Sequence, residues 1–152
     1  MEELYKLTIR RMNKRRIKYL VAGGIAVSLY GYNRATEDID FLIRSDEENV
    51  KKIVGLMNKM GMKTSLPKNE EEIKSTIHTM FVSKHPGFYY FKIDVMPINK
   101  RRFDALWKKR KIFKYDNVKF PVISRENLIK LKRKSNRGKD QIDVSELEKR
   151  KT

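Results

Sequence analysis

Hydrophobic residues recur along this 152-residue chain with two different periods. A recurrence every three or four residues predicts amphipathic helices over residues 2–16, 25–32, 47–60, 101–110, 125–134 and 139–150. Alternation of apolar and polar residues, or a short apolar run, predicts strands over residues 17–22, 38–43, 76–83, 88–96, 111–114 and 118–122. Helices and strands interspersed in this way predict an α/β (α+β) fold, in which a mixed, partly antiparallel sheet is flanked by helices.

Short polar segments separate these elements and indicate where the chain turns. Asp46 and Ser124 each precede a predicted helix and can cap its first turn. The residues Lys-His-Pro-Gly at 84–87 predict a hairpin between the flanking strands, whereas residues 69–75 fit a weak helix or a loop equally well. Because no repeat or linker divides the chain, we expect a single domain, 1–152, with a basic helical C-terminal region over about 124–152.

One predicted strand carries two acidic residues. Because alternate residues of a strand share a face, Asp38 and Asp40 project side by side, while Ile39 and Phe41 point the other way. Such a pair would repel in a dry cleft unless a divalent cation neutralised it, and Mg²⁺ prefers oxygen ligands. Asp94 also lies between apolar strand residues. Three acids on neighbouring strands would form a two-metal site with Asp94 as general base, although an isolated strand aspartate on a wet face would explain Asp94 equally well.

Two consecutive glycines, Gly23 and Gly24, lie between a predicted strand and a predicted helix. Glycine lets the backbone approach a ligand closely and adopt positive φ, and a helix that starts there favours phosphate. Ser28, one turn into the helix, could add a hydroxyl group. Many Gly-Gly pairs only turn the chain, and this sequence has neither a P-loop motif nor a dinucleotide-binding glycine motif.

The segment Tyr19–Arg44 resembles the polymerase-beta-like nucleotidyltransferase superfamily, because Gly-Gly is followed after thirteen residues by Asp-x-Asp. The resemblance implies a nucleoside triphosphate such as ATP and two Mg²⁺ ions, or Mn²⁺, at the metal ligands Asp38, Asp40 and Asp94. It also implies that the triphosphate is lined by Gly23, Gly24 and Ser28. Arg34 and Thr36 form the Arg-x-Thr-x-Asp-x-Asp pattern of small prokaryotic members. We therefore expect them near the nucleotide, with a solvated loop arginine as the alternative for Arg34.

The tail Leu128–Leu147 resembles the C-terminal region of small bacterial and archaeal members, including the abortive-infection toxin-like group. There we expect Lys139 to reach the nucleotide, and Asp140 and Asp143 to pair with neighbouring Lys or Arg residues. The Gly-Ser-x-Ala-Arg-Gly motif of minimal antitoxin-type relatives is absent. This departure disfavours an antitoxin that transfers AMP to proteins.

Charge points to the acceptor. The formal charge is +17, and residues 77–152 account for +13 of it, a field that attracts polyanions. Phe103 and Trp107, four residues apart in the basic region, fit helix anchors better than base-stacking residues. An ordinary protein with an unusually cationic surface is the alternative, but we expect RNA, such as a tRNA end, to contact Lys100, Arg101, Arg102, Lys108, Lys109, Arg110, Lys132, Arg133, Lys134 and Arg137.

The sequence contains no cysteine and no apolar run of the roughly 20 residues that span a membrane, which favours a cytoplasmic protein. We expect it to transfer a nucleoside monophosphate to a hydroxyl group of RNA with release of pyrophosphate. One alternative is a catalytically inactive nucleotide- or RNA-binding protein or toxin–antitoxin partner. Another is an antibiotic nucleotidyltransferase, which the +17 charge disfavours because cationic aminoglycosides would be repelled. A homodimer or a partner protein could supply further acceptor surface.

Overall fold

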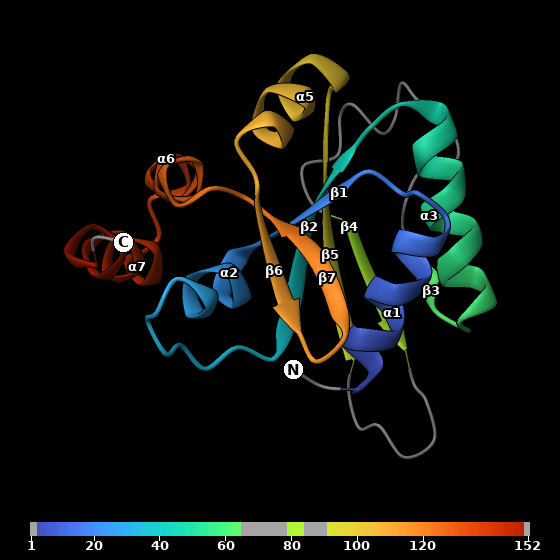
Figure 1. Ribbon diagram of the computed structural model, residues 1–152, viewed down its shortest axis with the longest axis horizontal. Helices are drawn as coiled ribbons and strands as arrows, with labels where there is room; N and C mark the ends of the chain where they lie inside the picture. The colour runs from blue at the N-terminus through green and yellow to red at the C-terminus, as the bar shows by residue number, and fades with distance from the viewer. Residues whose placement is uncertain (1–2, 65–78, 84–90, 151–152) are drawn as a thin grey trace.

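The computed structural model describes residues 3–64, 79–83 and 91–150 (Figure 1). Its strands are β1 (Tyr19–Ala22), β2 (Asp38–Arg44), β3 (Lys63–Thr64), β4 (Thr79–Ser83), β5 (Phe91–Ile98), β6 (Lys111–Tyr115) and β7 (Val118–Val122). Its helices are α1 (Glu3–Lys14), α2 (Gly23–Leu29), α3 (Glu47–Lys59), α5 (Lys100–Lys108), α6 (Arg125–Ser135) and α7 (Gly138–Lys149).

All seven strands belong to one sheet, in the order β3-β4-β5-β2-β1-β7-β6. The central strand β2 runs antiparallel to β1 and parallel to β5. β7 runs parallel to β1 and forms an antiparallel hairpin with β6. The predicted mixed sheet flanked by helices is therefore confirmed.

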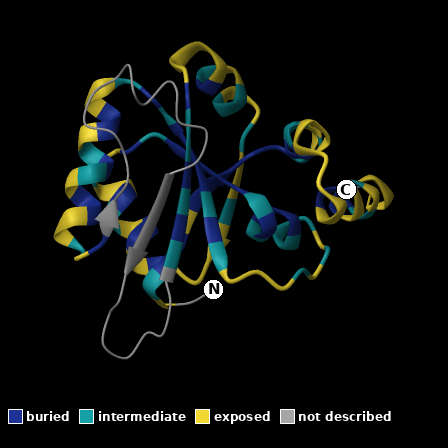
Figure 2. Ribbon diagram, turned by 180° about the vertical axis from the view of Figure 1, so that it is seen from behind, coloured by how far each residue is buried: buried dark blue, intermediate teal, exposed yellow. Residues whose placement is uncertain are grey.

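One face of the sheet packs against α1 and α3 and forms the main apolar core. Tyr19 of β1 meets Phe41 of β2 edge-to-face, with ring centroids 5.4 Å apart, and the Tyr19 hydroxyl donates to Asn13 Oδ1 of α1 at 2.8 Å. Asn49 of α3 is buried and donates from Nδ2 to the carbonyl oxygens of Lys18 and Arg44. Figure 2 shows the buried strands enclosed by helices whose outer surfaces are exposed. The opposite face of β2 does not take part in this core.

The opposite face is only partly covered. Arg44 of β2 lies 3.9 Å from Asp104 of α5, so α5 covers one end of this face. Helices α2, α6 and α7 lie on the other side of the molecule from α1 and α3 (Figure 1). The acidic residues Asp38 and Asp40 of β2 are half-buried on this face.

Both predicted helix caps are present. The Asp46 carboxylate accepts a hydrogen bond from the Asn49 amide at the start of α3, and the Ser124 hydroxyl accepts one from the Asn127 amide at the start of α6. These side chains satisfy amide groups that a helix leaves unpaired in its first turn. The two caps locate the helix starts within one residue of the predicted bounds.

Some boundaries differ from the prediction. α2 begins at Gly23 rather than at residue 25, so both glycines lie in its first turn. The two-residue strand β3 was not predicted, because a segment that short carries no recognisable alternation. Antiparallel pairing of β4 with β5 confirms the predicted hairpin, whereas its turn at 84–87 and the ambiguous segment 69–75 lie outside the described residues.

Within residues 3–64, 79–83 and 91–150, no helix has the length and apolar character that crossing a bilayer requires.

Candidate active site

The register between β2 and β5 brings the predicted acidic residues together. Asp40 is the direct neighbour of Asp94, and Asp38 is the direct neighbour of Lys92. Residues two apart on a strand share a face, so all four side chains lie on the face opposite the α1/α3 core. The buried residues Ile39 and Ile93 alternate with them on the other face.

Lys92 bridges two of the three carboxylates. Its Nζ lies 3.2 Å from Asp38 Oδ2 and 3.0 Å from Asp94 Oδ2. In the observed side-chain positions, no three His, Cys, Asp or Glu residues within the described ranges are grouped to hold one metal ion. The Lys92 ammonium group instead supplies positive charge between Asp38 and Asp94.

The carboxylates perturb one another. Burial raises the pKa of Asp40 above its usual value, and the nearby negative charges of Asp94 and Asp38 raise it further, although Lys132 and Lys92 partly offset this. For Lys92, burial lowers the pKa, but its hydrogen bonds to Asp94 and Asp38 outweigh this, so the net pKa is raised. The cluster therefore favours a bound positive charge.

The absence of a side chain at Gly23 makes room for the Asp40 carboxylate. Gly23 has φ +61°, and a Cβ atom at this position would lie 1.8 Å from Asp40 Oδ2. Gly24 is also closely approached, because its Cβ would lie 3.0 Å from Thr36 and 3.2 Å from Arg34 Nη1. The two glycines thus bring the start of α2 against the acidic strand on one side and against the loop before that strand on the other.

A buried ionic network connects this loop to the C-terminal helices. Arg34 Nη1 lies 2.8 Å from Asp143 Oδ2, and Lys132 Nζ lies 2.7 Å from the same oxygen. Lys132 also lies 3.2 Å from Asp140 Oδ1, and Arg137 Nε lies 2.9 Å from Asp140 Oδ2. Asp140 and Asp143 are each only 1% exposed. Their predicted pairing with neighbouring cations is confirmed, and Arg34 is a tethered, partly buried residue rather than a solvated one.

The structure separates the remaining predicted nucleotide-binding residues. The Ser28 hydroxyl donates to the Arg34 carbonyl at 3.1 Å, so it holds the loop that carries Arg34. Thr36 Oγ1 donates to the Asp38 carbonyl at 3.2 Å, at the start of the acidic strand. Lys139 is exposed in the first turn of α7. Four of these residues therefore lie together beside the carboxylates, namely Gly23, Gly24, Arg34 and Thr36. Ser28 instead holds the loop through its hydrogen bond to Arg34.

One predicted RNA contact requires correction. Lys132 is only 7% exposed and its ammonium group pairs with Asp140 and Asp143, so it is not part of an exposed basic surface. Arg110 is partly buried and lies over the Trp107 ring at 4.1 Å. The other eight predicted contact residues are exposed, namely Lys100, Arg101, Arg102, Lys108, Lys109, Arg133, Lys134 and Arg137.

The aromatic pair in this region has a structural role. Phe103 is fully buried and stacks on Trp107 at a centroid distance of 5.8 Å. Lys18 Nζ also lies 4.8 Å from the Trp107 ring centre. These contacts confirm the prediction that the pair anchors α5.

The sequence analysis missed Lys92 and gave Lys132 a different role. Lys92 lies two residues before Asp94 in an alternating strand, a spacing that places it on the same face as the acid. Lys132 lies four residues after the buried Leu128, a spacing that places it on the inner side of α6. Both spacings can be read from the sequence, but the roles of the two lysines depend on their acidic partners on β2, β5 and α7, which the spacing does not reveal.

Two kinds of comparison relate the chain to known proteins. The sequence model of the family described as nucleotidyl transferase AbiEii toxin, type IV toxin–antitoxin system, matches residues 12–151. No curated protein matches the sequence at a significant level. The family match covers most of the chain, including the carboxylates, the glycines and the C-terminal ionic network.

Several solved structures share the fold. The lincomycin-bound lincosamide antibiotic adenylyltransferase LnuA superposes with a TM-score of 0.69 at 17% identity, covering 97% of this chain and 96% of its own. An antigenic nucleotidyltransferase-like protein from Paracoccidioides brasiliensis gives 0.64 at 17% identity, covering 95% and 73%. The antibiotic-resistance factor ANT(2'')-Ia gives 0.58 at 11% identity, covering 97% and 84%. At these identities the likeness establishes the fold.

We predict that Gly23→Ala destabilises the protein by at least about 2 kcal/mol, because alanine is strained at positive φ and its Cβ would displace Asp40. The matched control is Gly55→Ala on α3, where a Cβ meets nothing within 4 Å and should stabilise the helix by about 0.5–1 kcal/mol. Urea unfolding of both variants measures the effect. Equal stability of Gly23→Ala and the wild type would contradict the packing described for Gly23.

We predict a pH-dependent cost for Asp140→Asn. Burial alone would raise the pKa of Asp140, but hydrogen bonds from Ser135, Arg137 and Lys132 hold it well below its usual value. A depressed folded-state pKa contributes stability above the unfolded pKa of about 3.9, and this is lost as the pH falls through the folded-state pKa. Asp140→Asn should therefore cost about 1–3 kcal/mol at pH 7 and progressively less below pH ~4.

Urea unfolding between pH 7 and pH 3 checks this prediction. The control is Glu126→Gln, which removes an exposed partner of Lys130 on α6 and should change stability little. A difference between Asp140→Asn and the wild type that stayed constant over this range would contradict the ionic role of Asp140.

Proposed function

This chain belongs to the nucleotidyl transferase AbiEii toxin family of type IV toxin–antitoxin systems, and from that premise we propose that it transfers a nucleoside monophosphate from a nucleoside triphosphate to a hydroxyl group of RNA. The transfer releases pyrophosphate and depends on a divalent metal ion, Mg²⁺ or Mn²⁺. The proposed catalytic residues are Asp38, Asp40 and Asp94.

The observation that supports this proposal best is the β2–β5 register. It places Asp40 beside Asp94, which lies 54 residues later in the chain, with Asp38 on the same face. A surface that only bound RNA would gain nothing from three adjacent carboxylates, since each repels phosphate. Their cost is offset when a cation binds among them.

The donor set fits magnesium. All three proposed ligands are carboxylates, and the Lys92 ammonium group already occupies a cation position between Asp38 and Asp94. Because the backbone register fixes their shared face, side-chain rotation can gather the acids without movement of the strands. When bound, two metal ions would stabilise charge on the reacting phosphate and make the attacking hydroxyl more acidic.

The residues around the glycines would hold the nucleotide. Gly23 and Gly24 let the Asp40 carboxylate and the loop with Arg34 and Thr36 approach the start of α2, and the triphosphate would lie against this part of the backbone. Arg34 uses one nitrogen on Asp143 and keeps further donors for phosphate oxygens, while Ser28 and Thr36 order the loop that carries it. Lys139, exposed at the start of α7, would reach the nucleotide from the C-terminal side.

Asp94 would act on the acceptor. Its carboxylate would accept the proton of the acceptor hydroxyl as the hydroxyl oxygen bonds to the α-phosphorus and the bond to pyrophosphate breaks. The exposed cations of α5 and α6 would bind the RNA phosphates. Membership of a toxin family further suggests an antitoxin as a protein partner in the cytoplasm.

We predict that the purified protein, with Mg²⁺ and α-labelled nucleoside triphosphates, labels RNA from a total RNA pool. Asp38→Asn combined with Asp40→Asn should reduce labelling to the level without enzyme, because the variant lacks the anionic donors. The control is Asp46→Asn, which replaces an aspartate outside the site with a residue that can still cap α3. Gel analysis of labelled RNA and chromatography of small molecules measure the products.

The outcomes separate the parts of the proposal. Equal background labelling by wild type and the double variant, with intact RNA binding, would reject catalysis in favour of an inactive binding protein. Label that depends on Asp38 and Asp40 but appears only on a small molecule, such as an antibiotic, would retain nucleotidyl transfer and reject RNA as the acceptor.

We predict that Lys92→Met raises the affinity for Mn²⁺ by about three- to tenfold in the absence of nucleotide, because it removes a positive charge that competes for Asp38 and Asp94. Isothermal titration calorimetry with Mn²⁺ measures this. Lys100→Met is the matched control, since Lys100 pairs with Asp104 on α5. Unchanged or weaker Mn²⁺ binding by Lys92→Met would contradict the placement of the metal.

A further inference from the structure

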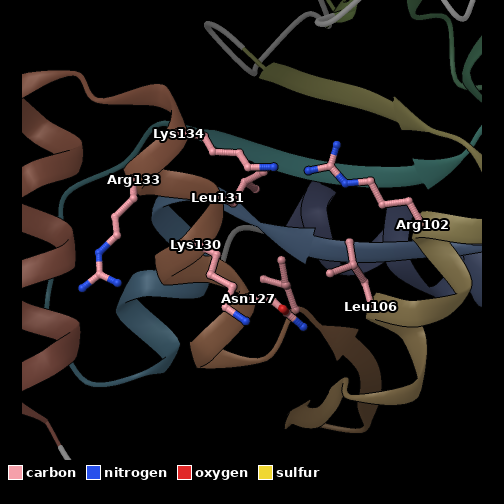
Figure 3. A pocket seen from close by; sticks show the side chains of 8 residues that line it. Arg102, Leu106, Asn127, Lys130, Leu131, Arg133 and Lys134 are labelled. Carbon is pink, nitrogen blue, oxygen red and sulfur yellow. The ribbon is translucent and has the colours of Figure 1, made fainter.

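A hollow of 370 Å³ lies between α5 and α6 (Figure 3). Arg102 and Leu106 of α5 line one side, and Asn127, Leu131 and Lys134 of α6 line the other. Its volume falls within the range of about 300–1,000 Å³ that small-molecule sites occupy. The hollow is therefore large enough for a nucleotide-sized group.

Two cations face each other across this hollow. Figure 3 shows the charged ends of Arg102 and Lys134 extending towards one another from the two helices. Both side chains are exposed, and neither forms an ion pair with the rest of the described chain. Among the described residues, none that lines the hollow is acidic. Two like charges held in this way repel each other, and an anion placed between them relieves the repulsion.

The other two cations of the hollow are already occupied. Lys130 Nζ lies 3.0 Å from Glu126 Oε1, and Arg133 pairs with Glu148. Figure 3 shows Arg133 pointing away from Arg102, towards α7. The anion-binding capacity of the hollow therefore rests on Arg102 and Lys134.

The floor of the hollow is apolar. Leu106, Ile123 and Leu131 line it, and Asn127 adds an amide group with both donors and acceptors. Aliphatic lining residues together with two cations suit a ligand with a flat apolar body and a negative group. A nucleotide within an RNA strand has both, in its base and its phosphate.

The hollow borders the carboxylate site. The Ile123 amide donates to the Val21 carbonyl at 3.0 Å, two residues before Gly23. Arg44, on the same face of β2 as Asp40, lies 3.9 Å from Asp104 of α5. On α6, Lys132 lies close enough to influence the pKa of Asp40. A strand bound in the hollow would therefore lie next to the acids.

We propose that the hollow between α5 and α6 binds one nucleotide of the acceptor RNA strand. Arg102 and Lys134 contact its phosphate, and Leu106 and Leu131 support its base. This inference rests on the proposed function, since it names where the RNA acceptor binds. An acidic segment of a protein partner is the competing occupant, but the aliphatic lining suits a nucleotide base and the hollow borders the proposed catalytic carboxylates.

The test is fluorescence anisotropy with a labelled single-stranded RNA of about 12 nucleotides, without metal or nucleoside triphosphate. Arg102→Gln combined with Lys134→Gln should weaken binding about tenfold at moderate salt. It should also reduce the dependence of log K on log salt concentration by about 0.7, the contribution of one phosphate of a single strand. A second variant, Leu131→Ser, should weaken binding to RNA but not to inorganic polyphosphate.

The matched control is Lys51→Gln combined with Lys59→Gln. It removes the same charge from the exposed surface of α3, on the other side of the molecule from α6 (Figure 1). Equal weakening by both double variants would overturn the proposal, because binding would then follow net charge alone. Normal RNA binding by the Arg102/Lys134 variant, with loss of an acidic protein partner, would also overturn it.

The two proposals fail in different ways. The Asp38→Asn/Asp40→Asn protein should bind RNA at least as tightly as the wild type, because removal of the two carboxylates affects transfer only. If this protein and the wild type both bind RNA through the hollow while neither transfers label, the inference stands and the proposed catalysis fails. If RNA is labelled normally by the Arg102/Lys134 variant with unchanged affinity, the inference fails and the catalysis stands.

Discussion

The parallel register of β2 against β5 is the constraint on which the rest of this structure depends. It makes Asp40 and Asp94 direct neighbours and places Asp38 on the same face. Three carboxylates confined to one partly buried face repel one another, and burial adds to this cost, as the raised pKa of Asp40 indicates. The surrounding chain offsets this repulsion with nearby cations.

The cations come from two parts of the fold. Lys92 projects from β5 itself and bridges Asp38 and Asp94. Lys132 approaches from α6 and is held there by Asp140 and Asp143, which pair with its buried ammonium group. Because Asp143 also binds Arg34, the same network positions the loop that precedes the acidic strand. The C-terminal helices are thereby connected to the site through ionic contacts.

Fold and substrate are separate questions for this protein. Its structure superposes on LnuA and on ANT(2'')-Ia over nearly its whole length, at 17% and 11% identity. A shared fold supports many substrates, since specificity depends on the residues that line the site. For this chain the net charge of +17 and the facing cations of α5 and α6 favour a polyanionic acceptor. The residues that line the site, rather than the sheet, therefore distinguish one acceptor class from another.

The sequence by itself determined the local features. Alternation placed Asp38 and Asp40 on one face, helical spacing predicted the main helices, and Asp46 and Ser124 marked two helix starts. These properties depend on residues a few positions apart, so a linear pattern contains them. The Gly-Gly and Asp-x-Asp spacing likewise identified the superfamily, which the family match confirms.

Only the tertiary structure decided which distant residues meet. Asp94 lies beside Asp40 because β5 pairs with β2 in one register, and a shift of one residue would have turned Asp94 into the core. Lys132 was expected at the surface but is buried, because α7 folds back on α6 and brings two acids to it. Strand partners, register and helix packing follow from burial of the whole chain, which local patterns do not encode.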